Sequence, residues 1–572
     1  MPKTVRLLAL SLLLTPALFA ATHAEKIDAL LAAYNKQRYF NGSALVAEKG
    51  KVIVRKGYGL ANMEWQIPNG PDTKFRLGSI TKQFTSMVIM QLVGEGKINL
   101  DEKITTYLPD YRKDTGGKVT VRHLLTHTSG IPSYTSIPGF IQNQSREPYS
   151  VADFVKKYTS GDLEFEPGSK WVYDNSGYFL LGAIIERVTG KTYEDALRER
   201  IFEPLGMKDS GYDHFNTLLP KRATGYQLTP NGYENAPYLD MSIPYAAGSL
   251  YSTVDDLFKW DRALYTDKLL AADLKKTMFT PVLQNYGFGW AVRKMKLDDD
   301  KTEVATIAHN GGINGFSTVE IRLPDTQDLV VLLDNTSRGD KLDAAAKGII
   351  DILHGIEPPA PKASLVDELM KTLSTGDARA AIARYRELKS KSAQTFDFSE
   401  PELNRLGYTL LQRGRVADAI DVFLLNVEEY PKSWNVYDSL GEAYAVHGDR
   451  DLAIANYKKS LELNAQNTSG AQALKRLENP PAKIDAATLD KYVGTYELAP
   501  GFNIVVTREG DALFGQATGQ PKFEMAADST TEFHLLVVPA KITFAPDGSS
   551  LTLHQGGRDM PGKRVATSAP SR

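Results

Sequence analysis

A serine and a lysine three residues apart stand immediately before a strongly apolar stretch. Ser79 and Lys82 precede residues 84–93, where most side chains are apolar. Positions i and i+3 of a helix share one face, so the Lys82 amine would reach the Ser79 hydroxyl. An apolar setting favours a neutral amine that can accept the serine proton, and a helix N-terminus favours negative charge developing on Ser79. The pair could therefore form a nucleophile; an N-capping serine beside a snorkelling lysine is the alternative.

A tyrosine and an asparagine two residues apart could assist this nucleophile. Tyr173 and Asn175 would lie on the same side of an extended turn. The phenol could relay a proton, and the amide could hold Lys82 and a substrate carbonyl. On its own, this segment also fits a tyrosine that packs and makes one hydrogen bond.

A histidine and two glycines before a predicted strand form the third group. His309, Gly311 and Gly312 come just before the β-prone run that starts at Phe316. Glycine lets a ligand approach the backbone closely, and exposed strand N–H groups can pair with a peptide or stabilise an oxyanion. His309 adds a group that titrates near neutral pH. A glycine-rich turn with a surface histidine is the alternative.

In their sequence order, these three groups resemble the active site of the serine β-lactamase and penicillin-binding protein superfamily. The similarity is greatest to the class C-like branch, with its D-stereospecific peptidases and carboxylesterases, and it covers about residues 27–355. Other segments that resemble this family are GYG (57–59), HLLTHTSG (123–130), EPG (166–168), PLGM (204–207) and YGFGW (286–290). The resemblance implies a covalent acyl-enzyme that needs no metal and no cofactor.

The resemblance also implies a role for each residue. Ser79 would be the acylated nucleophile, Lys82 its proton acceptor, and Tyr173 the base that assists deacylation. Asn175 would bind substrate. The backbone N–H groups of Ser79 and Gly312 would form the oxyanion hole.

The third motif, which contains His309 and Gly311, differs from that of the true β-lactamases. Those enzymes carry the lysine of a K-[ST]-G motif at the position of His309, and that lysine attracts a substrate carboxylate. A histidine is charged only part of the time near pH 7 and reaches less far. The resemblance associates histidine here with D-amino-acid peptidases and related hydrolases, and tryptophan with many esterases.

We therefore expect an exported serine hydrolase that acts on a small peptide, amide or ester. The peptide would contain D-amino acids, and the activity would be carboxypeptidase-like or aminopeptidase-like. Two alternatives stay open: a β-lactamase or carboxylesterase, and a non-catalytic ligand-binding receptor or scaffold.

Other chemistries fit the sequence less well. His123 and His127 are four residues apart on a predicted helix, as zinc ligands can be, but no glutamate follows His123 as H-E-x-x-H requires. The G-x-S-x-G motif of α/β-hydrolases is missing from the sequence. The chain has no cysteine, which excludes disulfides, thiolate metal sites and cysteine nucleophiles.

The composition and the first residues limit partners and location. Lys plus Arg total 67 against 69 Asp plus Glu, so a broad basic surface for nucleic acid is not expected. Residues 1–24 have two basic residues, an apolar run and a small-residue end, which predicts a signal peptide and a periplasmic or secreted protein. A retained N-terminal membrane anchor is the alternative. No later stretch is long and apolar enough to span a bilayer.

Proline-rich segments at 357–361 and 479–481 divide the chain after the predicted signal peptide into three predicted domains. Residues 25–356 should form the β-lactamase/transpeptidase-like α/β domain, an antiparallel sheet flanked by helices with its terminal strands adjacent. Residues 482–572, with short β-prone runs between turns, should form a small antiparallel β-barrel or sandwich.

Residues 364–478 contain an internal repeat. Four residues recur after 34 positions, the length of a tetratricopeptide unit: Gly407, Gly414, Ala419 and Phe423 return as Gly441, Gly448, Ala453 and Tyr457. We expect paired α-helices in which the small residues allow close approach and the aromatic residue fills the space between. Such a segment could hold a peptide or protein partner in its groove, or act as a spacer.

Overall fold

The computed structural model describes residues 21–137, 140, 144–229, 232–478, 484–499, 502–518, 522–535, 540–555 and 558–565. The chain forms two compact units, Met1–Ala363 and Ser364–Arg572. Residues 1–20 of the predicted signal peptide lie outside the described residues. Helix α1 (His23–Lys36) begins after the N-cap Thr22, so the predicted cleavage end falls within the first turn of this helix. Within the described ranges, no helix is both long enough and apolar enough to cross a membrane.

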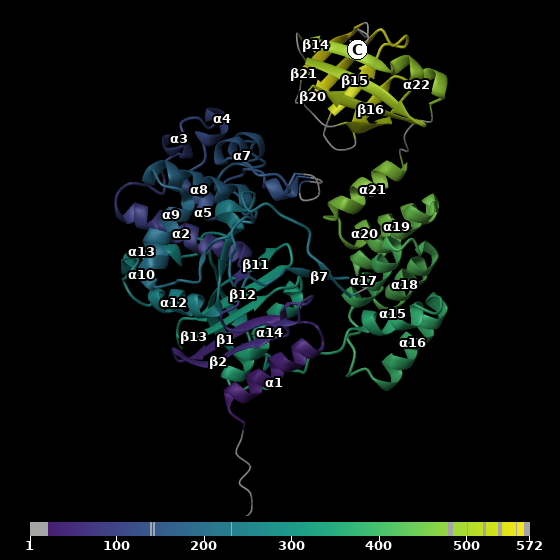
Figure 1. Cartoon of the computed structure of the whole chain (residues 1–572). Helices are drawn as coiled ribbons and strands as arrows, with labels where there is room; N and C mark the ends of the chain where they lie inside the picture. The colour runs from purple at the N-terminus through teal and green to yellow at the C-terminus, as the bar shows by residue number, and fades with distance from the viewer. Residues whose placement is uncertain are drawn as a thin grey trace, which may run out of the picture. The chain divides into compact units, whose positions relative to one another are not determined.

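The first unit is built around an antiparallel sheet of six strands in the order β10-β11-β12-β13-β1-β2 (Figure 1). The strands are β1 (Gly42–Glu48), β2 (Lys51–Tyr58), β10 (Ala291–Lys296), β11 (Glu303–Ile313), β12 (Phe316–Leu323) and β13 (Asp328–Asp334). Strand β1 pairs with β13, so the first and last strands of the unit are adjacent, as predicted. Lys49 and Gly50 both have positive φ, 49° and 77°, as a two-residue hairpin turn between β1 and β2 requires.

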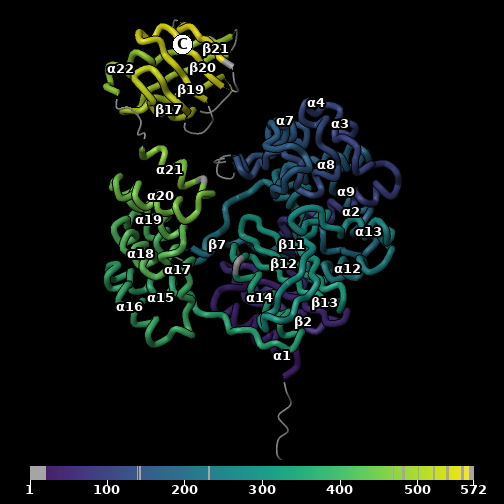
Figure 2. The backbone as a smooth tube through the Cα atoms, turned by 180° about the vertical axis from the view of Figure 1, so that it is seen from behind, coloured from purple at the N-terminus to yellow at the C-terminus, as the bar shows by residue number. Residues whose placement is uncertain are grey.

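Both faces of this sheet are covered. Ala44 and Val46 of β1 belong to one core, with α1 and α14 (Gly339–Leu353), whereas Leu45 and Ala47 face a second, larger core. Figure 2 shows α1 and α14 from behind, beside the strands. Side chains alternate between the faces of a strand, so a strand buried on both sides has a continuous apolar sequence. The run 329–333 in β13 is such a sequence, with every side chain buried.

The larger core contains a lobe of helices, of which α2 (Thr81–Gly94) is the most enclosed. The helix is buried from Thr81 through Met90, as its apolar sequence predicts. The other helices of this unit are α3 (Ile104–Tyr107), α4 (Lys113–Gly116), α5 (Val121–Leu125), α7 (Val151–Tyr158), α8 (Asn175–Thr189), α9 (Tyr193–Leu197), α10 (Glu203–Leu205), α11 (Tyr245–Gly248), α12 (Val254–Leu264) and α13 (Ala272–Met278), with short turns η1 (Gly78–Ile80), η2 (Tyr134–Ser136) and η3 (Arg198–Phe202). Small strands are β3 (Leu60–Asn62), β4 (Ile67–Pro68), β5 (Phe75–Arg76), β6 (Gly211–Tyr212), β7 (Tyr226–Thr229), β8 (Gly232–Asn235) and β9 (Leu250–Ser252).

The helical part of the second unit follows the 34-residue recurrence. Its helices are α15 (Leu365–Leu373), α16 (Ala378–Lys391), α17 (Glu400–Gln412), α18 (Val416–Glu429), α19 (Trp434–His447), α20 (Arg450–Leu463) and α21 (Thr468–Glu478). A Cβ on Gly407 would lie 2.4 Å from the Phe423 ring, and one on Gly441 would lie 3.2 Å from the Tyr457 ring. The pairs α17–α18 and α19–α20 therefore each pack a glycine against an aromatic ring, as expected from the repeat.

The C-terminal part of this unit is a closed barrel of eight antiparallel strands, which decides between the barrel and the sandwich. Its elements are α22 (Ala486–Tyr492), β14 (Gly494–Ala499), β15 (Phe502–Glu509), β16 (Ala512–Ala517), β17 (Phe523–Ala527), β18 (Glu532–Leu535), β19 (Ala540–Phe544), β20 (Ser550–Gln555) and β21 (Arg558–Val565). Strand β14 pairs with β21 and closes the barrel. Closure leaves no free edge for association with other strands.

Candidate active site

Ser79 lies in the turn η1, and Lys82 lies in the first turn of α2. The Lys82 Nζ atom is 3.0 Å from Ser79 Oγ, as the spacing predicts. The Lys82 side chain is 0% exposed. Burial lowers the pKa of the Lys82 amine to about 7, against the opposing effect of the Asp174 carboxylate. Near neutral pH the amine is therefore available in its uncharged form.

The other two contacts of Lys82 determine where its lone pair points. Nζ donates to Asn175 Oδ1 at 2.9 Å and to the Ala247 carbonyl at 2.8 Å. Both oxygens can only accept hydrogen bonds. A neutral amine has two hydrogens, so both are used by these acceptors and the lone pair remains for the Ser79 hydroxyl. This is the geometry that a proton acceptor for Ser79 needs.

Tyr173 reaches Ser79 from the segment before α8. Its hydroxyl donates to Ser79 Oγ at 2.8 Å, and Lys82 Nζ lies 4.9 Å from the centre of its ring. Burial raises the pKa of the Tyr173 phenol, so the phenol keeps its proton near neutral pH. The phenol is thus a donor in the resting site. It can assist deacylation as a base only after it has given its proton away.

Asn175 is the first residue of α8 and links two parts of the site. Its Oδ1 accepts from Lys82, and its Nδ2 donates to Thr135 Oγ1 at 3.1 Å. Its backbone N–H donates to Ser133 Oγ at 3.1 Å. These bonds define the orientation of the amide and aim its oxygen at Lys82.

Strand β11 and the turn η1 meet where the oxyanion hole was predicted. A Cβ on Gly311 would lie 1.9 Å from the Leu77 carbonyl oxygen, and one on Gly78 would lie 2.9 Å from Gly312 N. Only glycine permits this approach, and Gly78 also has φ +54°. The pairing of β10 with β11 ends at Ala308, so in the described structure residues 309–313 pair with β12 alone. The predicted oxyanion donors, Ser79 N and Gly312 N, are thus on adjoining segments.

The imidazole of His309 is uncharged near pH 7, and not partly charged as the sequence had led us to expect. Burial lowers the pKa of His309 to about 3, with a further lowering by Lys82. Nδ1 lies 2.7 Å from the Asn310 carbonyl and must donate to it, so Nε2 accepts from the Tyr286 hydroxyl at 2.9 Å. The imidazole is therefore neutral and fully bonded, and it supplies no positive charge to a substrate carboxylate.

His123 and His127 each use one ring nitrogen to accept a backbone hydrogen bond. His123 Nδ1 accepts from Thr120 N at 3.2 Å, and His127 Nδ1 accepts from Asp174 N at 3.1 Å. No cluster of three or more potential metal ligands occurs in the part of the chain that the structure describes. The sequence does not predict that His127 lies beside Tyr173, although HLLTHTSG and YGFGW resemble segments of the family. His127 of the first segment and Tyr286 of the second pack together with Tyr173, and this contact depends on how distant parts of the chain fold together.

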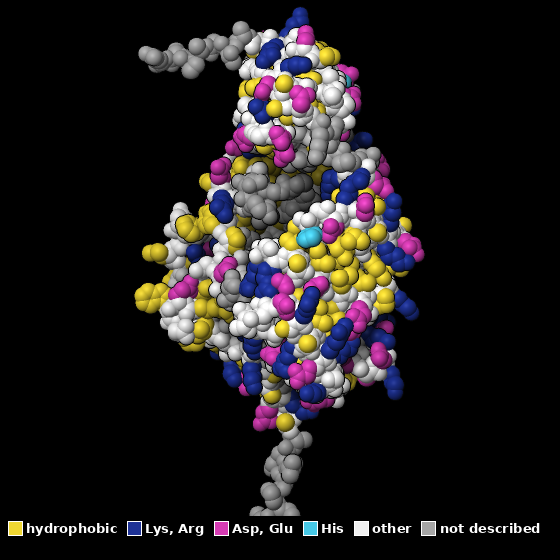
Figure 3. Space-filling view, turned by 90° about the vertical axis from the view of Figure 1, so that its right-hand side faces the viewer, with side chains coloured by type: hydrophobic (Ala, Val, Ile, Leu, Met, Phe, Trp, Pro, Cys, Tyr) yellow, Lys and Arg dark blue, Asp and Glu magenta, His cyan; other side chains and the backbone are white. Residues whose placement is uncertain are grey.

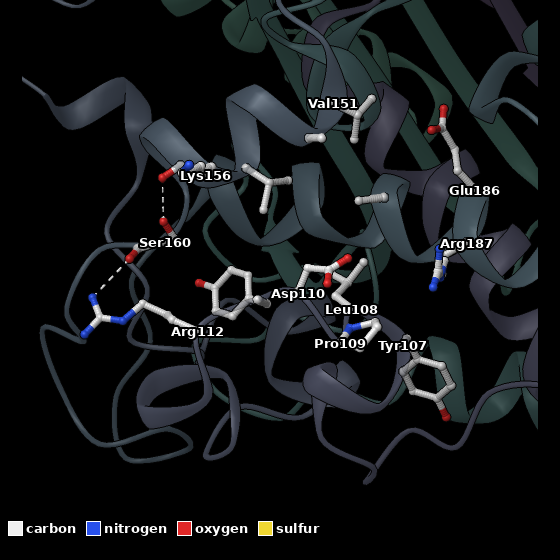
Figure 4. Close-up of a pocket in the computed structure, with 14 residues that line it drawn as sticks. Tyr107, Leu108, Pro109, Asp110, Arg112, Val151, Lys156, Ser160, Glu186 and Arg187 are labelled. Carbon is white, nitrogen blue, oxygen red and sulfur yellow. Dashed lines mark hydrogen bonds between the residues drawn. The ribbon is translucent and has the colours of Figure 1, made fainter. Parts of the chain in front are cut away.

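A pocket of about 890 Å³ lies elsewhere in the helical lobe (Figure 4). Its walls come from residues 107–112, from α7 and from the C-terminal half of α8, including Glu186 and Arg187. None of the residues predicted to carry the chemistry lines it. This pocket is thus distinct from the site of Ser79.

The fold and the site define the class of a serine hydrolase: a serine at the start of a buried helix contacts a buried lysine and a phenol, beside an antiparallel sheet. The sequence model of the beta-lactamase family matches residues 27–354, and the chain belongs to this family. A second model, a domain of unknown function (DUF3471), matches residues 478–564, which include all but the last residue of the barrel.

Relatives and solved structures agree with this assignment. The chain is 30% identical to a penicillin-binding protein of Bacillus subtilis over 391 residues, which are 64% of this chain and 84% of the relative. The D-amino acid amidase of Ochrobactrum anthropi is 28% identical, with a TM-score of 0.50, over 58% of this chain and 97% of the amidase. A penicillin-binding protein homologue from Pyrococcus abyssi, described as octameric, shares the fold over 94% of this chain and 99% of its own, with a TM-score of 0.50 at 21% identity.

Proposed function

We propose that the protein hydrolyses an amide bond in a small peptide or amide that contains a D-amino acid, through an acyl-Ser79 intermediate. The proposal is carried by the three contacts of Lys82 Nζ, which lies 3.0 Å from Ser79 Oγ and bonds to two obligate acceptors, Asn175 Oδ1 and the Ala247 carbonyl. In the neutral amine these two acceptors use both hydrogens and leave the lone pair for Ser79. The similarity to the D-amino acid amidase of Ochrobactrum anthropi supports this substrate class. Small esters, which form the same acyl-enzyme, are the second candidate substrate.

Acylation follows from the contacts of Ser79. Lys82 takes the Ser79 proton while Oγ bonds to the substrate carbonyl carbon, and the N–H groups of Ser79 and Gly312 stabilise the resulting oxyanion. Tyr173 gives its proton to the leaving nitrogen as the carbon–nitrogen bond breaks. The ammonium of Lys82 then stabilises the phenolate of Tyr173.

Deacylation restores each group. The Tyr173 phenolate accepts a proton from water as the water oxygen attacks the acyl carbon. When the intermediate collapses, Ser79 Oγ leaves and recovers its proton from Lys82. Water is consumed, the acid product departs, and the three side chains return to their resting protonation states.

The charge of the site supports an amide or ester over a substrate that depends on a carboxylate. His309 is neutral, and Lys82 is buried with its hydrogens already used. Neither residue can therefore replace the lysine that attracts the carboxylate of a β-lactam. Hydrolysis of β-lactams as the main activity is correspondingly disfavoured.

Labelling of Ser79 tests the proposal. A fluorescent phosphonate should label the wild-type protein on one peptide that contains Ser79, and hydrolysis of D-aminoacyl amides should stop in parallel. The Ser79→Ala protein should neither be labelled nor turn over substrate. Labelling that survives the substitution would contradict the nucleophile. Labelling without turnover of any amide or ester would favour the receptor alternative.

Export is also part of the proposal. It depends on residues 1–24, whose sequence predicts a signal peptide. Cell fractionation of the full-length chain, with N-terminal sequencing of the mature protein, distinguishes a cleaved signal from a retained anchor.

A further inference from the structure

His127 combines deep burial with an unusual backbone conformation. It is 1% exposed and has φ +56°. Left-handed backbone is uncommon for residues other than glycine, and it persists where the surrounding structure requires it. The residue lies two positions beyond the end of α5, in the loop that leads to Ser129. Such a conformation points to a specific task.

The left-handed conformation lets one residue bind the chain on both sides of Tyr173. The His127 carbonyl accepts from Val172 N at 3.0 Å. The His127 Nδ1 atom accepts from Asp174 N at 3.1 Å. The two backbone amides that flank Tyr173 are therefore both held by His127, one by its carbonyl and one by its ring.

The ring of His127 also packs against the phenol itself. Its centre is 4.4 Å from that of Tyr173, 4.7 Å from Tyr286 and 5.1 Å from Tyr178. Because Nδ1 accepts a hydrogen bond, the neutral ring carries its hydrogen on Nε2. Nε2 is buried and has no hydrogen-bond partner among the described residues. The ring therefore contributes one acceptor and a packing surface, and no further polar link is seen.

The ring keeps this acceptor over the working range of pH. Burial lowers the pKa of His127 well below its usual value, and the neighbouring Lys82 and His309 lower it further. Protonation would place a hydrogen on Nδ1 and break the bond from Asp174 N. The neutral ring is thus the form that fits the backbone around Tyr173.

We propose that His127 is a positioning residue for Tyr173, holding the phenol so that its hydroxyl points at Ser79 Oγ and at the leaving group. This inference rests on the proposed function, in which Tyr173 protonates the leaving nitrogen. A badly placed phenol should harm substrates whose leaving group needs a proton. It should matter much less for a leaving group that departs as a stable anion.

Two substitutions separate the contributions of His127. His127→Asn tolerates left-handed backbone and keeps an acceptor, Oδ1, in place of Nδ1, but it loses the ring. His127→Phe keeps a ring and loses the acceptor. The substrates are the p-nitroanilide and the p-nitrophenyl ester of D-phenylalanine, because nitrophenolate leaves without protonation and the anilide nitrogen does not.

We expect His127→Phe to lower kcat for the anilide by about 10²-fold, the range for loss of a positioned acid, with little change in KM. The loss on the ester should be much smaller, and His127→Asn should fall between wild type and His127→Phe. Tyr173→Phe should show the same selective loss. The double variant His127→Phe/Tyr173→Phe should be no worse than Tyr173→Phe alone, because the two residues act through one group.

His123→Asn is the matched control. His123 lies in the same segment and also accepts a backbone N–H through Nδ1, but that bond caps α5. Its anilide-to-ester ratio should equal that of wild type.

Three results would overturn the inference. They are equal losses on the two substrates in both His127 variants, losses in the double variant that equal the sum of the two single losses, and a His127→Phe protein with the wild-type ratio and wild-type kcat. If Tyr173→Phe itself shows no selective loss, the proposed role of Tyr173 is wrong and the inference is lost with it. If Tyr173→Phe shows the loss and the His127 variants do not, only the inference is wrong.

Discussion

At the scale of single residues, burial and hydrogen bonding decide the charge of each polar group in the site. Burial lowers the pKa of Lys82 to about 7, so a large share of the amine is uncharged near neutral pH, and its two acceptors direct the lone pair of that form. Burial raises the pKa of Tyr173, so the phenol keeps its proton. An acceptor and a donor therefore meet at Ser79 Oγ without a permanently charged group in direct contact with it.

The neutral state of His309 leads to a prediction about pH. A terminal carboxylate is ionised throughout the range from pH 5 to 8, and a histidine with a pKa near 3 stays uncharged over the same range. The ratio of kcat/KM for a peptide with a free carboxylate to that for its amidated analogue should therefore not change between pH 5 and 8. Lys82 and Asp174 titrate near pH 7, so a ratio that rises toward pH 5 in the wild type but not in His309→Asn would indicate protonation of His309. In His309→Lys, a charged amine at this position should increase the ratio.

The types and order of the reacting residues could be predicted from the sequence, because Ser79, Lys82 and Tyr173 lie in short local motifs. The charge of His309 could not, since it depends on Tyr286 and on enclosure by distant segments. The same limit applies to His127, which the spacing suggested only as a zinc ligand. Its contacts with residues 172–174 depend on how the chain folds back.

At the scale of elements, the site depends on the close approach of η1 to β11. Thr318 of β12 donates to the Leu77 carbonyl at 2.7 Å, on the same oxygen that a Cβ of Gly311 would strike. The strand and the turn are therefore joined at a point where no side chain fits. The sequence predicts the glycines as places of close approach, but not which segment approaches them.

Two neighbouring glycines provide a matched test of this packing. A Cβ on Gly311 meets the Leu77 oxygen at 1.9 Å, whereas a Cβ on Gly312 meets nothing within 4 Å. Gly311→Ala should destabilise the protein by roughly 1–3 kcal/mol, as overpacking does. Gly312→Ala should leave the free energy of unfolding nearly unchanged. Denaturant titration of both variants measures the difference, and equal stabilities would show that the turn and the strand are farther apart.

At the scale of the whole molecule, the beta-lactamase family match covers the first compact unit, and the second unit contains the helix pairs and the barrel. The recurrence of Gly407 and Phe423 as Gly441 and Tyr457 made the helix pairs predictable, because each glycine meets its own aromatic ring. The sequence could not show whether the C-terminal strands form a barrel or a sandwich, because closure depends on the pairing of β14 with β21. A peptide or protein partner for the helix pairs stays a prediction, as does the tetratricopeptide assignment.

The distribution of charge is consistent with the balance of the composition. On the face shown in Figure 3, basic and acidic side chains are interspersed and no large field of one sign is visible. The sequence as a whole has a formal net charge of −2. This agrees with a small-molecule substrate better than with a polyanion.

The central claim is that uncharged Lys82 removes the proton of Ser79, and the pH dependence of Ser79 acylation tests it most directly. The rate of phosphonate labelling should rise with pH, reach half of its maximum near pH 7, and stay level above, because the raised pKa of Tyr173 keeps the phenol protonated. Burial also raises the pKa of Asp174 to about 7, so Lys82→Ala is the necessary control. That variant should react about 10²-fold more slowly or worse and should lose the dependence near pH 7. A rate that rises only near pH 10, or a Lys82→Ala protein with the wild-type rate and profile, would contradict the account.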